Sequence, residues 1–241
     1  MKLADFRILT FDCYGTLIDW ERGLLAALQP LLSKAPGAPS TDAVLELFAQ
    51  HEFAQESEAP SMPYSQLLAV VYQRIAAAWH VSVSNEEANI FGASIPDWPE
   101  FPDSVAALAY LRQYYKLAIL SNVDRVSFRA SHARLQVAFD GIYTAQDIGS
   151  YKPSPRNFAY LLERVKHDFG WDKGAVLHVA QSLTHDHAPA NQFGLASAWI
   201  DRRHAQDGWG ATKPPRETPR YAFRFDSMAA LVEAHRRELA G

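Results

Sequence analysis

Chemically reactive side chains follow several apolar segments of this sequence, each at the point where its segment ends. Asp12 comes directly after the apolar run 8–11, and Gly15 permits a sharp turn that leaves the carboxylate uncovered. Polar residues follow three further apolar segments or their loops: Ser121 and Asn122, Lys152, and Ser182 with Asp186. A carboxylate at the carboxyl end of a parallel strand lies where open α/β sheets bind their ligands.

Each of these residues also has an ordinary structural explanation. Asp12 could cap a helix or form a turn, and Ser121 and Asn122 are common turn residues. Lys152 precedes a proline, where lysine is most often exposed, and Asp186 could cap a following helix. Four such groups at strand ends, in the order that would bring them to one edge of a sheet, favour a shared site over four separate structural roles.

The second part of the chain, from Asp103 onward, alternates between strand and helix patterns. Helices are expected from Asp103, which would cap the first of them, from Asp124 to Leu135, around 158–165 and from Asp226. Buried strands are expected at 117–120, 141–144, 175–179 and 196–200, with a last edge strand at 221–225. Together with the strand before Asp12, this alternation predicts a parallel, doubly wound sheet of the α/β class, with a Rossmann-like core.

The first part of the chain, between the strand at 8–11 and about residue 95, shows only helical patterns. Thr41 is expected to cap a helix that runs to about Glu56, and Ser84 with Glu87 matches a capping box. Another helix is expected to start at Pro63.

Domain boundaries follow from this helical block and from the prolines after it. Three prolines between Pro96 and Pro102 indicate a stiff hinge. We therefore expect an inserted all-helical cap domain at 19–98 and a Rossmann-like catalytic core at 1–18 and 99–241. The stretch 207–219, with its glycines and prolines, is expected to be a surface loop.

Composition excludes several classes of protein. The formal net charge of −4 gives no electrostatic basis for binding nucleic acid, and no apolar run approaches the roughly 20 residues that span a bilayer. The N-terminus leads straight into a strand with no signal-peptide pattern, and Cys13 is the single cysteine, so we expect a cytoplasmic protein without disulfides. The apolar cap helices leave open a homodimer.

Three segments together carry a family resemblance. Phe11-Asp12-Cys13-Tyr14-Gly15-Thr16-Leu17, Ser121-Asn122 and Tyr151-Lys152-Pro153 resemble the haloacid dehalogenase (HAD) superfamily, and most of all its L-2-haloacid dehalogenase branch. The superfamily has a nucleophilic Asp after the first strand, a Ser or Thr after the second, a Lys before the fourth and an acidic loop after it. The resemblance implies a HAD-like fold with a helical cap, over nearly the whole chain.

Two positions favour the dehalogenase branch over the phosphatases of the superfamily. The phosphatases need a second Asp two residues after the nucleophile, and Tyr14 stands there. They also need Mg²⁺, and Gln181 replaces the first acidic residue of the loop that would bind it, while Asp186 keeps the second. Because Mg²⁺ prefers anionic oxygen ligands and halide leaves without protonation, we expect no metal and no cofactor.

The resemblance implies nucleophilic catalysis on a small organic acid. Asp12 would displace halide from C2 of a 2-haloacid, and water would then hydrolyse the ester. Lys152 would keep Asp12 charged, and Asp186 would position or activate the water, with His185 and His187 as weaker candidates for assistance. The remaining predicted substrate-binding residues are Tyr14, Thr16, Ser121, Asn122 and Ser182.

The chain departs from the dehalogenase pattern in the cap and in the loops. The arginine that receives the halide in that branch has no counterpart between Gly23 and Gln73; Arg22 and Arg74 lie outside this range. Phe158 replaces an aromatic hydroxyl, and Leu183 replaces an Asn. Indole N–H groups are alternative halide donors, from Trp20, Trp79 or Trp98.

Three functions remain open at this point. The first is metal-independent dehalogenation of a 2-haloacid, as a hydrolase acting on carbon–halide bonds. The second is a phosphatase with an atypical metal site that tolerates Tyr14 and Gln181. The third is a binding protein that kept the fold without the chemistry.

Overall fold

Six parallel strands form one sheet in the order β3-β2-β1-β4-β5-β6, in a computed structural model that describes residues 1–241. The strands are β1 (Ile8–Phe11), β2 (Lys116–Ser121), β3 (Gly141–Thr144), β4 (Val176–Ala180), β5 (Ala196–Ile200) and β6 (Phe223–Phe225). The chain builds the sheet outward on one side of β1 and then on the other, so the order of strands reverses between β1 and β4. Open α/β sheets bind ligands at such a reversal. The predicted doubly wound sheet is confirmed.

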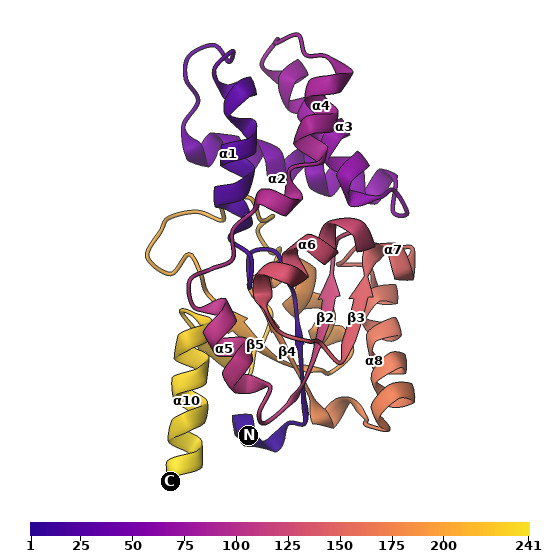
Figure 1. Cartoon of the computed structure of the whole chain (residues 1–241), viewed down its shortest axis with the longest axis vertical. Coiled ribbons are helices and arrows are strands. Elements are labelled where there is room, and N and C mark those ends of the chain that lie inside the picture. The colour runs from indigo at the N-terminus through magenta and orange to yellow at the C-terminus, as the bar shows by residue number, and fades with distance from the viewer.

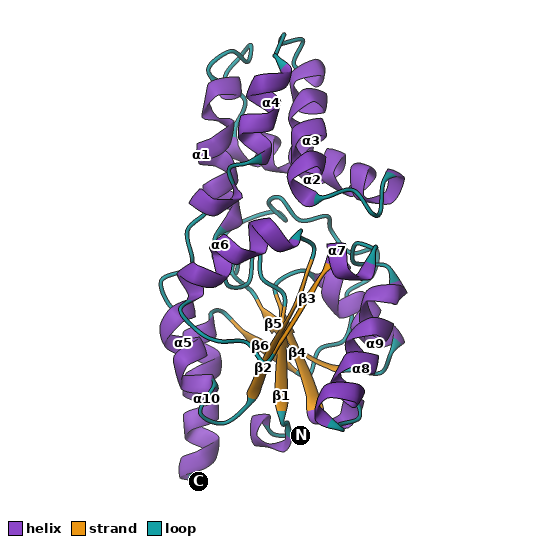
Figure 2. Ribbon diagram, turned by 45° about the vertical axis from the view of Figure 1, so that its right-hand side comes forward, coloured by secondary structure: helices purple, strands orange, loops and turns teal.

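Alternating side chains of the strands pack on the two faces of the sheet. Ile8 of β1 belongs to a smaller apolar cluster with Phe158 and Leu161, whereas Leu9 and Phe11 belong to the main core. In Figure 2, helices α5 (Ser104–Leu111) and α10 (Met228–Ala240) lie on one side of the sheet, and α8 (Pro155–Phe169) and α9 (Ala188–Gln192) lie on the other. The inner strands β1, β2 and β4 are therefore covered on both faces, as their continuous apolar sequences predict, whereas the edge strands β3 and β6 keep exposed side chains.

Four helices lie above the carboxyl ends of the strands, away from both termini (Figure 1). We call them the cap: α1 (Trp20–Leu32), α2 (Thr41–Glu58), α3 (Tyr64–Ala78) and α4 (Asn85–Gly92). The two connections between the cap and the sheet run side by side, because Ile18 pairs with Glu100 and Asp19 N–H donates to Pro99 O at 2.8 Å. We propose the cap and the remainder as the two domains expected from the sequence.

The helix termini agree with the sequence at some positions and differ at others. Ser84 and Glu87 form the predicted capping box of α4, and Asp124 caps α6 (Arg125–Leu135). The cap of α2 is Ser40 instead of Thr41, because the Ser40 hydroxyl accepts the N–H of Ala43. The cap of α10 is Ser227, so this helix begins two residues after the predicted Asp226.

Two further expectations are wrong. Asp103 does not cap α5 through its side chain, because its carboxylate accepts hydrogen bonds from Arg202 and from the N–H of Ala229. The stretch 207–219 is not wholly a surface loop, since Ala211 and Thr212 are buried. The remaining short elements are η1 (Leu3–Asp5), η2 (Ile95–Asp97), α7 (Ala145–Ile148), η3 (Lys173–Ala175) and the π-helix η4 (Leu183–His187). No helix has the length and apolarity required to cross a membrane.

Candidate active site

Asp12 is the first residue after β1 and begins the turn that leads to the cap. Its N–H donates to Val179 O at 3.1 Å, which continues the pairing with β4 and fixes the backbone under the carboxylate. Gly15 has a φ of +89°, and a Cβ there would lie 3.0 Å from Trp20 Nε1. Only glycine adopts this conformation without strain, so the turn depends on it.

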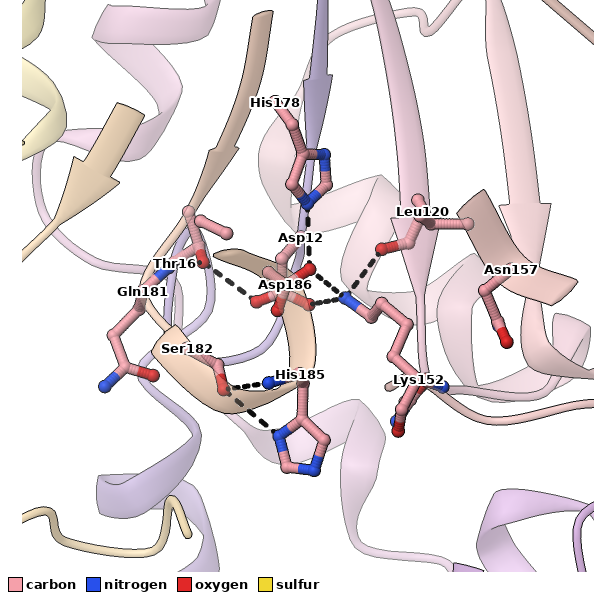
Figure 3. Close-up of polar contacts among 12 residues, drawn as sticks. Asp12, Thr16, Leu120, Lys152, Asn157, His178, Gln181, Ser182, His185 and Asp186 are labelled. Atoms are coloured by element: carbon pink, nitrogen blue, oxygen red, sulfur yellow. Dashed lines mark hydrogen bonds and ion pairs between the residues drawn. The ribbon is translucent and has the colours of Figure 1, made fainter. Parts of the chain in front are cut away.

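Lys152 joins two carboxylates at this edge of the sheet (Figure 3). Its Nζ donates to Asp12 Oδ1 at 2.8 Å, to Asp186 Oδ1 at 2.6 Å and to Leu120 O at 3.0 Å. An ammonium group has three hydrogens, so this lysine has no donor left for a ligand. All three charged side chains are buried, and Lys152 is only 1% exposed.

The charges of this trio depend on one another. Burial raises the pKa of Asp12, and contact with Lys152 limits the rise. Burial also opposes ionisation of Asp186, but Lys152 and His178 outweigh it and hold the pKa of Asp186 well below its usual range. For Lys152, the two carboxylates overcome the burial and raise the pKa. We infer one ammonium group between two carboxylates at neutral pH.

Thr16 and His178 hold the carboxylates from behind. The Thr16 hydroxyl donates to Asp12 Oδ2 at 2.8 Å and accepts the N–H of Gln181 at 2.9 Å. His178 Nε2 lies 2.8 Å from Asp186 Oδ1, and its Nδ1 lies 2.9 Å from the hydroxyl of Thr10. His178 was not among the predicted site residues; a histidine within an otherwise apolar buried strand was the available signal.

Asn122 fixes the backbone of Lys152. Its Oδ1 accepts the Lys152 N–H at 2.7 Å, and its Nδ2 donates to Lys152 O at 3.0 Å and to Glu56 Oε1 at 2.8 Å. The side chain of Asn122 therefore links the sheet, the lysine and the cap. The neighbouring Ser121 is buried, and its hydroxyl has no partner in the protein.

A small cavity lies between the carboxyl edge of the sheet and the cap. Its volume is about 50 Å³. The lining residues come from the core, from the cap and from the stretch after β5: Asp12, Tyr14, Asn122, Lys152, Gln181, Ser182, His185, Asp186, Trp20, Glu52, Glu56, Tyr64, Ala211 and Thr212.

Some of the predicted site residues line this cavity and others lie behind its wall. The side chains of the three predicted catalytic residues line it, as do Tyr14, Asn122 and Ser182. Thr16 and Ser121 lie behind its wall instead. The hydroxyl of Tyr14 is hydrogen-bonded to Ser131 at 2.9 Å, and burial raises the pKa of Tyr14 well above its ordinary value. Thr212 enters the cavity from a stretch that was expected to lie on the surface.

The cap contributes two buried carboxyl groups that the sequence analysis missed. Glu52 and Glu56 lie one turn apart on α2, each 6% exposed. Tyr64 donates to Glu52 Oε1 at 2.5 Å, and no lysine or arginine contacts either carboxyl group. Burial raises the pKa of Glu52 to about 8 and that of Glu56 well above its usual range. The pattern of α2 gives no signal for them, because the buried residues of this helix include polar as well as apolar side chains.

The two candidate histidines have different surroundings. His187 is buried away from the cavity, where its ring contacts Ser197 Oγ at 2.8 Å and Ala180 O at 2.9 Å. His185 lines the cavity, with its Nδ1 3.1 Å from Ser182 Oγ. Burial lowers the pKa of His185 to about 4, so its ring is neutral at physiological pH.

Most of the alternative halide donors lie elsewhere. Arg74 pairs with Glu58 at 2.6 Å, and Trp98 Nε1 donates to Ser94 at 3.2 Å. Neither residue lines the cavity, and neither do Arg22 or Trp79, whereas Trp20 does. The cavity therefore has no arginine, and its lysine is fully paired.

The chemistry of the donor set does not fit Mg²⁺. A magnesium ion at this edge would need the oxygens of Asp12 and Asp186, and the ammonium group of Lys152 lies within hydrogen-bond distance of both. Gln181 supplies a neutral amide whose Oε1 accepts from Thr212 at 3.2 Å, and Figure 3 shows this side chain directed away from the two carboxylates.

Known proteins resemble this chain in sequence and in fold. An (S)-2-haloacid dehalogenase of Pseudomonas sp. (strain YL) is 36% identical over 105 residues, which are 43% of this chain and 42% of that protein. The L-2-haloacid dehalogenase of Xanthobacter autotrophicus with chloropropionic acid covalently bound superposes with a TM-score of 0.75 at 18% identity, over 96% of this chain and 98% of that one.

A magnesium-bound relative has the same fold. The HAD-hydrolase YfnB of Bacillus subtilis, bound to magnesium, also reaches a TM-score of 0.75 at 17% identity, over 95% of this chain and 98% of that one. Fold similarity therefore does not separate the metal-dependent from the metal-free chemistry. The family model of haloacid dehalogenase-like hydrolases matches residues 6–194, which is most of the chain. The protein therefore belongs to the haloacid dehalogenase-like hydrolases.

Proposed function

We propose that the protein is a metal-independent 2-haloacid dehalogenase that acts through an ester on Asp12. The observation that carries the proposal is the Asp12 carboxylate, which lines the cavity with one oxygen held by Lys152 and the other by Thr16. The similarity to the Pseudomonas (S)-2-haloacid dehalogenase supports the choice of substrate. Halide departs as a stable anion, so the reaction needs neither a metal nor a general acid.

In the first step, one oxygen of Asp12 attacks C2 of the substrate. A carbon–oxygen bond forms as the carbon–halogen bond breaks, and the halide leaves with the bonding electron pair, so C2 is inverted. Lys152 and Thr16 fix the carboxylate in one orientation, which lowers the entropic cost of reaching the transition state. If Oδ2 is alkylated, Oδ1 still accepts a hydrogen bond from Lys152. If Oδ1 is alkylated, Oδ2 still accepts one from Thr16.

In the second step, water attacks the Asp12 carbonyl carbon and the developing negative charge falls on the oxygen that keeps its donor. Asp186 supports this step, because its Oδ2 is buried at the cavity and has no partner in the protein. We assign to Asp186 the orientation of the water and the transfer of its proton to the departing 2-hydroxyl oxygen. Asp12 is then released as a carboxylic acid and loses its proton to solvent.

Substrate binding requires donors for the carboxylate of the haloacid, because Lys152 has none left. The backbone N–H groups of Tyr14 and Asn122 make no hydrogen bond within the protein. Both residues line the cavity, as does Ser182. We assign the substrate carboxylate to this part of the wall, and we assign positioning roles to Thr16 and Ser121 behind it.

An isotope experiment tests the proposal. Chloroacetate and L-2-chloropropionate, assayed in the presence of a chelator, are expected to release halide. In a single turnover with excess enzyme in H₂¹⁸O, the label is expected in Asp12, because the new oxygen of the product comes from the carboxylate. Label in the first-turnover product would mean direct attack by water and would overturn the proposal.

Trapping the ester gives an independent measurement. In Asp186→Asn, the second step is expected to slow more than the first, so peptide mass spectrometry should find the ester on Asp12. Asp172→Asn is the matched control, because Asp172 is exposed and away from the cavity. If only phosphate esters are cleaved, and only with Mg²⁺, the phosphatase alternative is correct.

A further inference from the structure

Two unpartnered polar atoms face each other in the wall of the cavity. Glu56 Oε2, from the cap, and His185 Nε2, from the π-helix after β4, are 3.7 Å apart, and neither makes a hydrogen bond in the protein. Glu56 is 6% exposed, so this oxygen is an orphaned buried group beside the catalytic residues. Such groups carry a free-energy cost unless a ligand or a water pairs with them.

Hydrogen bonds around His185 assign its proton. Ser182 Oγ accepts the backbone N–H of His185 at 3.0 Å and lies 3.1 Å from Nδ1, so the hydroxyl hydrogen is available to Nδ1. The neutral ring then carries its proton on Nε2, as a donor. Figure 3 shows the Nε2 edge of the ring directed away from the Asp12 and Asp186 carboxylates.

Contacts around Glu56 leave it as a neutral acid with one free oxygen. Asn122 Nδ2 donates to Oε1, and no lysine or arginine lies within ion-pair distance. A buried carboxyl group without a cation favours the protonated form, in which it can donate a hydrogen bond. Since Asn122 occupies Oε1 as a donor, the proton belongs on Oε2. The titratable groups that face Glu56 are Glu52 on its own helix, Tyr64 on α3, and Tyr151, Lys152 and His185 from the core.

The two donors therefore converge on one acceptor. Donors 3.7 Å apart can both lie about 3 Å from a single atom. Because neither donor is exposed in the unliganded protein, the two side chains must move apart to admit that atom. Asp12 attacks from the core side, and the leaving group departs on the side opposite to the nucleophile, toward the cap. Resting on the proposed function, we propose that Glu56 and His185 form the halide site, in which two neutral donors replace a cationic side chain.

This site stabilises the charge that develops on the halogen without transferring a proton. The halide keeps the electron pair of the broken bond, and both donors keep their hydrogens. A cation at this point would also attract the substrate carboxylate, whereas two neutral donors only 3.7 Å apart favour a monatomic anion.

Bromide binding tests the site without turnover. Bromide is titrated at constant ionic strength, with the tryptophan fluorescence of the protein as the signal, since Trp20 lines the cavity. The response of Glu46→Gln corrects for quenching of the other five tryptophans. Glu56→Ala is expected to weaken bromide binding about tenfold, which is the loss of one hydrogen bond. Glu56→Gln keeps a donor opposite His185 and is expected to weaken it about threefold. Glu46→Gln is the matched control, because Glu46 is exposed on the same helix.

The pH dependence separates this role from a structural one. Bromide binding to the wild type is expected to weaken as the pH rises and Glu56 ionises, whereas binding to Glu56→Gln is expected to lose that dependence. Glu56→Ala should also slow chloroacetate more than bromoacetate, because the poorer leaving group depends more on the donors. Bromide affinities that match the control, or that improve with rising pH, would overturn the inference.

The two proposals fail separately. If ¹⁸O enters Asp12 but the affinity for bromide does not depend on Glu56, only the proposed halide site is ruled out. Bromide binding that depends on Glu56, without any ester on Asp12, would leave the anion site standing and remove the dehalogenase.

Discussion

The core side and the cap side of the cavity differ in how completely their polar atoms are paired. On the core side, Lys152 uses all three hydrogens within the protein, and both oxygens of Asp12 accept hydrogen bonds. Of the two carboxylates that Lys152 joins, only Asp186 keeps a free oxygen, Oδ2, which we assign to the water of the second step. On the side that faces the cap, Glu56 of α2 keeps a free buried oxygen, and Nε2 of the core residue His185 beside it is free as well. A paired set is held in one geometry before the substrate arrives, whereas an unpaired set gains its partners from the ligand.

The difference suggests a division of labour between the two sides. The core side supplies a fixed nucleophile, in which reorganisation during the reaction would be a cost. The cap side supplies donors whose pairing is completed by the leaving group. We therefore expect changes on the core side to abolish turnover or folding, and changes on the cap side to alter affinity and pH dependence.

The largest effect is expected for Asp12→Asn. The amide is a far weaker nucleophile and leaves Lys152 with one carboxylate in place of two, so halide release should fall by about 10³-fold or more. Halide release and peptide mass spectrometry measure the loss of turnover and of the ester. Turnover in Asp12→Asn near the level of Asp172→Asn would show that the core side does not supply the nucleophile.

Lys152→Met is expected to cost most in stability. It leaves two buried carboxylates facing each other without a cation, and breaking a buried pair in this way costs about 3–5 kcal/mol. Urea unfolding measures the change. Lys166→Met is the control, because Lys166 is exposed in its pair with Asp172, and it should change the free energy of unfolding by less than about 0.5 kcal/mol. Equal losses in the free energy of unfolding for Lys152→Met and Lys166→Met would mean that Lys152 does not stabilise the core side.

The same division explains what the sequence could predict. Asp12 and Asn122 follow apolar strands, and Lys152 and Asp186 lie in the connections at the same edge. Parallel strands bring these connections together whatever the details of packing. The sheet and its strand-end site were therefore predictable from the order of segments. Their exact pairings, such as His178 with Asp186, depend on side-chain packing across neighbouring strands.

The cap side could not be predicted in this way. Glu52 and Glu56 lie on a helix of 18 residues whose buried face includes several polar side chains, so its pattern does not show which acids turn inward. Thr212 reaches the cavity from a stretch rich in glycine and proline, which has no periodicity to read. How a cap docks over a sheet is a long-range packing outcome, and single residues at that contact carry no local signal.

The pH dependence of the free energy of unfolding tests the cap side through Glu52. Its pKa is about 8 in the folded protein and ordinary when unfolded, so between about pH 4.5 and 8 the folded state binds more protons. Stability is therefore expected to fall as the pH rises through this window, by at most about 1.4 kcal/mol per unit. Glu52→Gln cannot ionise and should lose about 2 kcal/mol less than the wild type between pH 5.5 and 7.5.

Urea unfolding at the two pH values measures this effect. Glu46→Gln again provides the control, because an exposed acid on the same helix should leave the pH dependence unchanged. A wild-type stability that rises over this window, or a Glu52→Gln variant with the same slope as the control, would show that the cap-side acids are ionised and paired.

The smallest expected effect is that of a chelator on turnover. A divalent ion at the core side would have to displace Lys152 from between Asp12 and Asp186, at 2.8 and 2.6 Å, and Gln181 offers it no charge in exchange. Chelation is therefore expected to change the rate of halide release by less than about twofold, and millimolar magnesium should not raise it. Activity that disappears with chelator and returns with magnesium would contradict the paired core side. In that case the core side would bind a metal ion and the cap side an anion. Both sides would then need a ligand to pair their polar atoms.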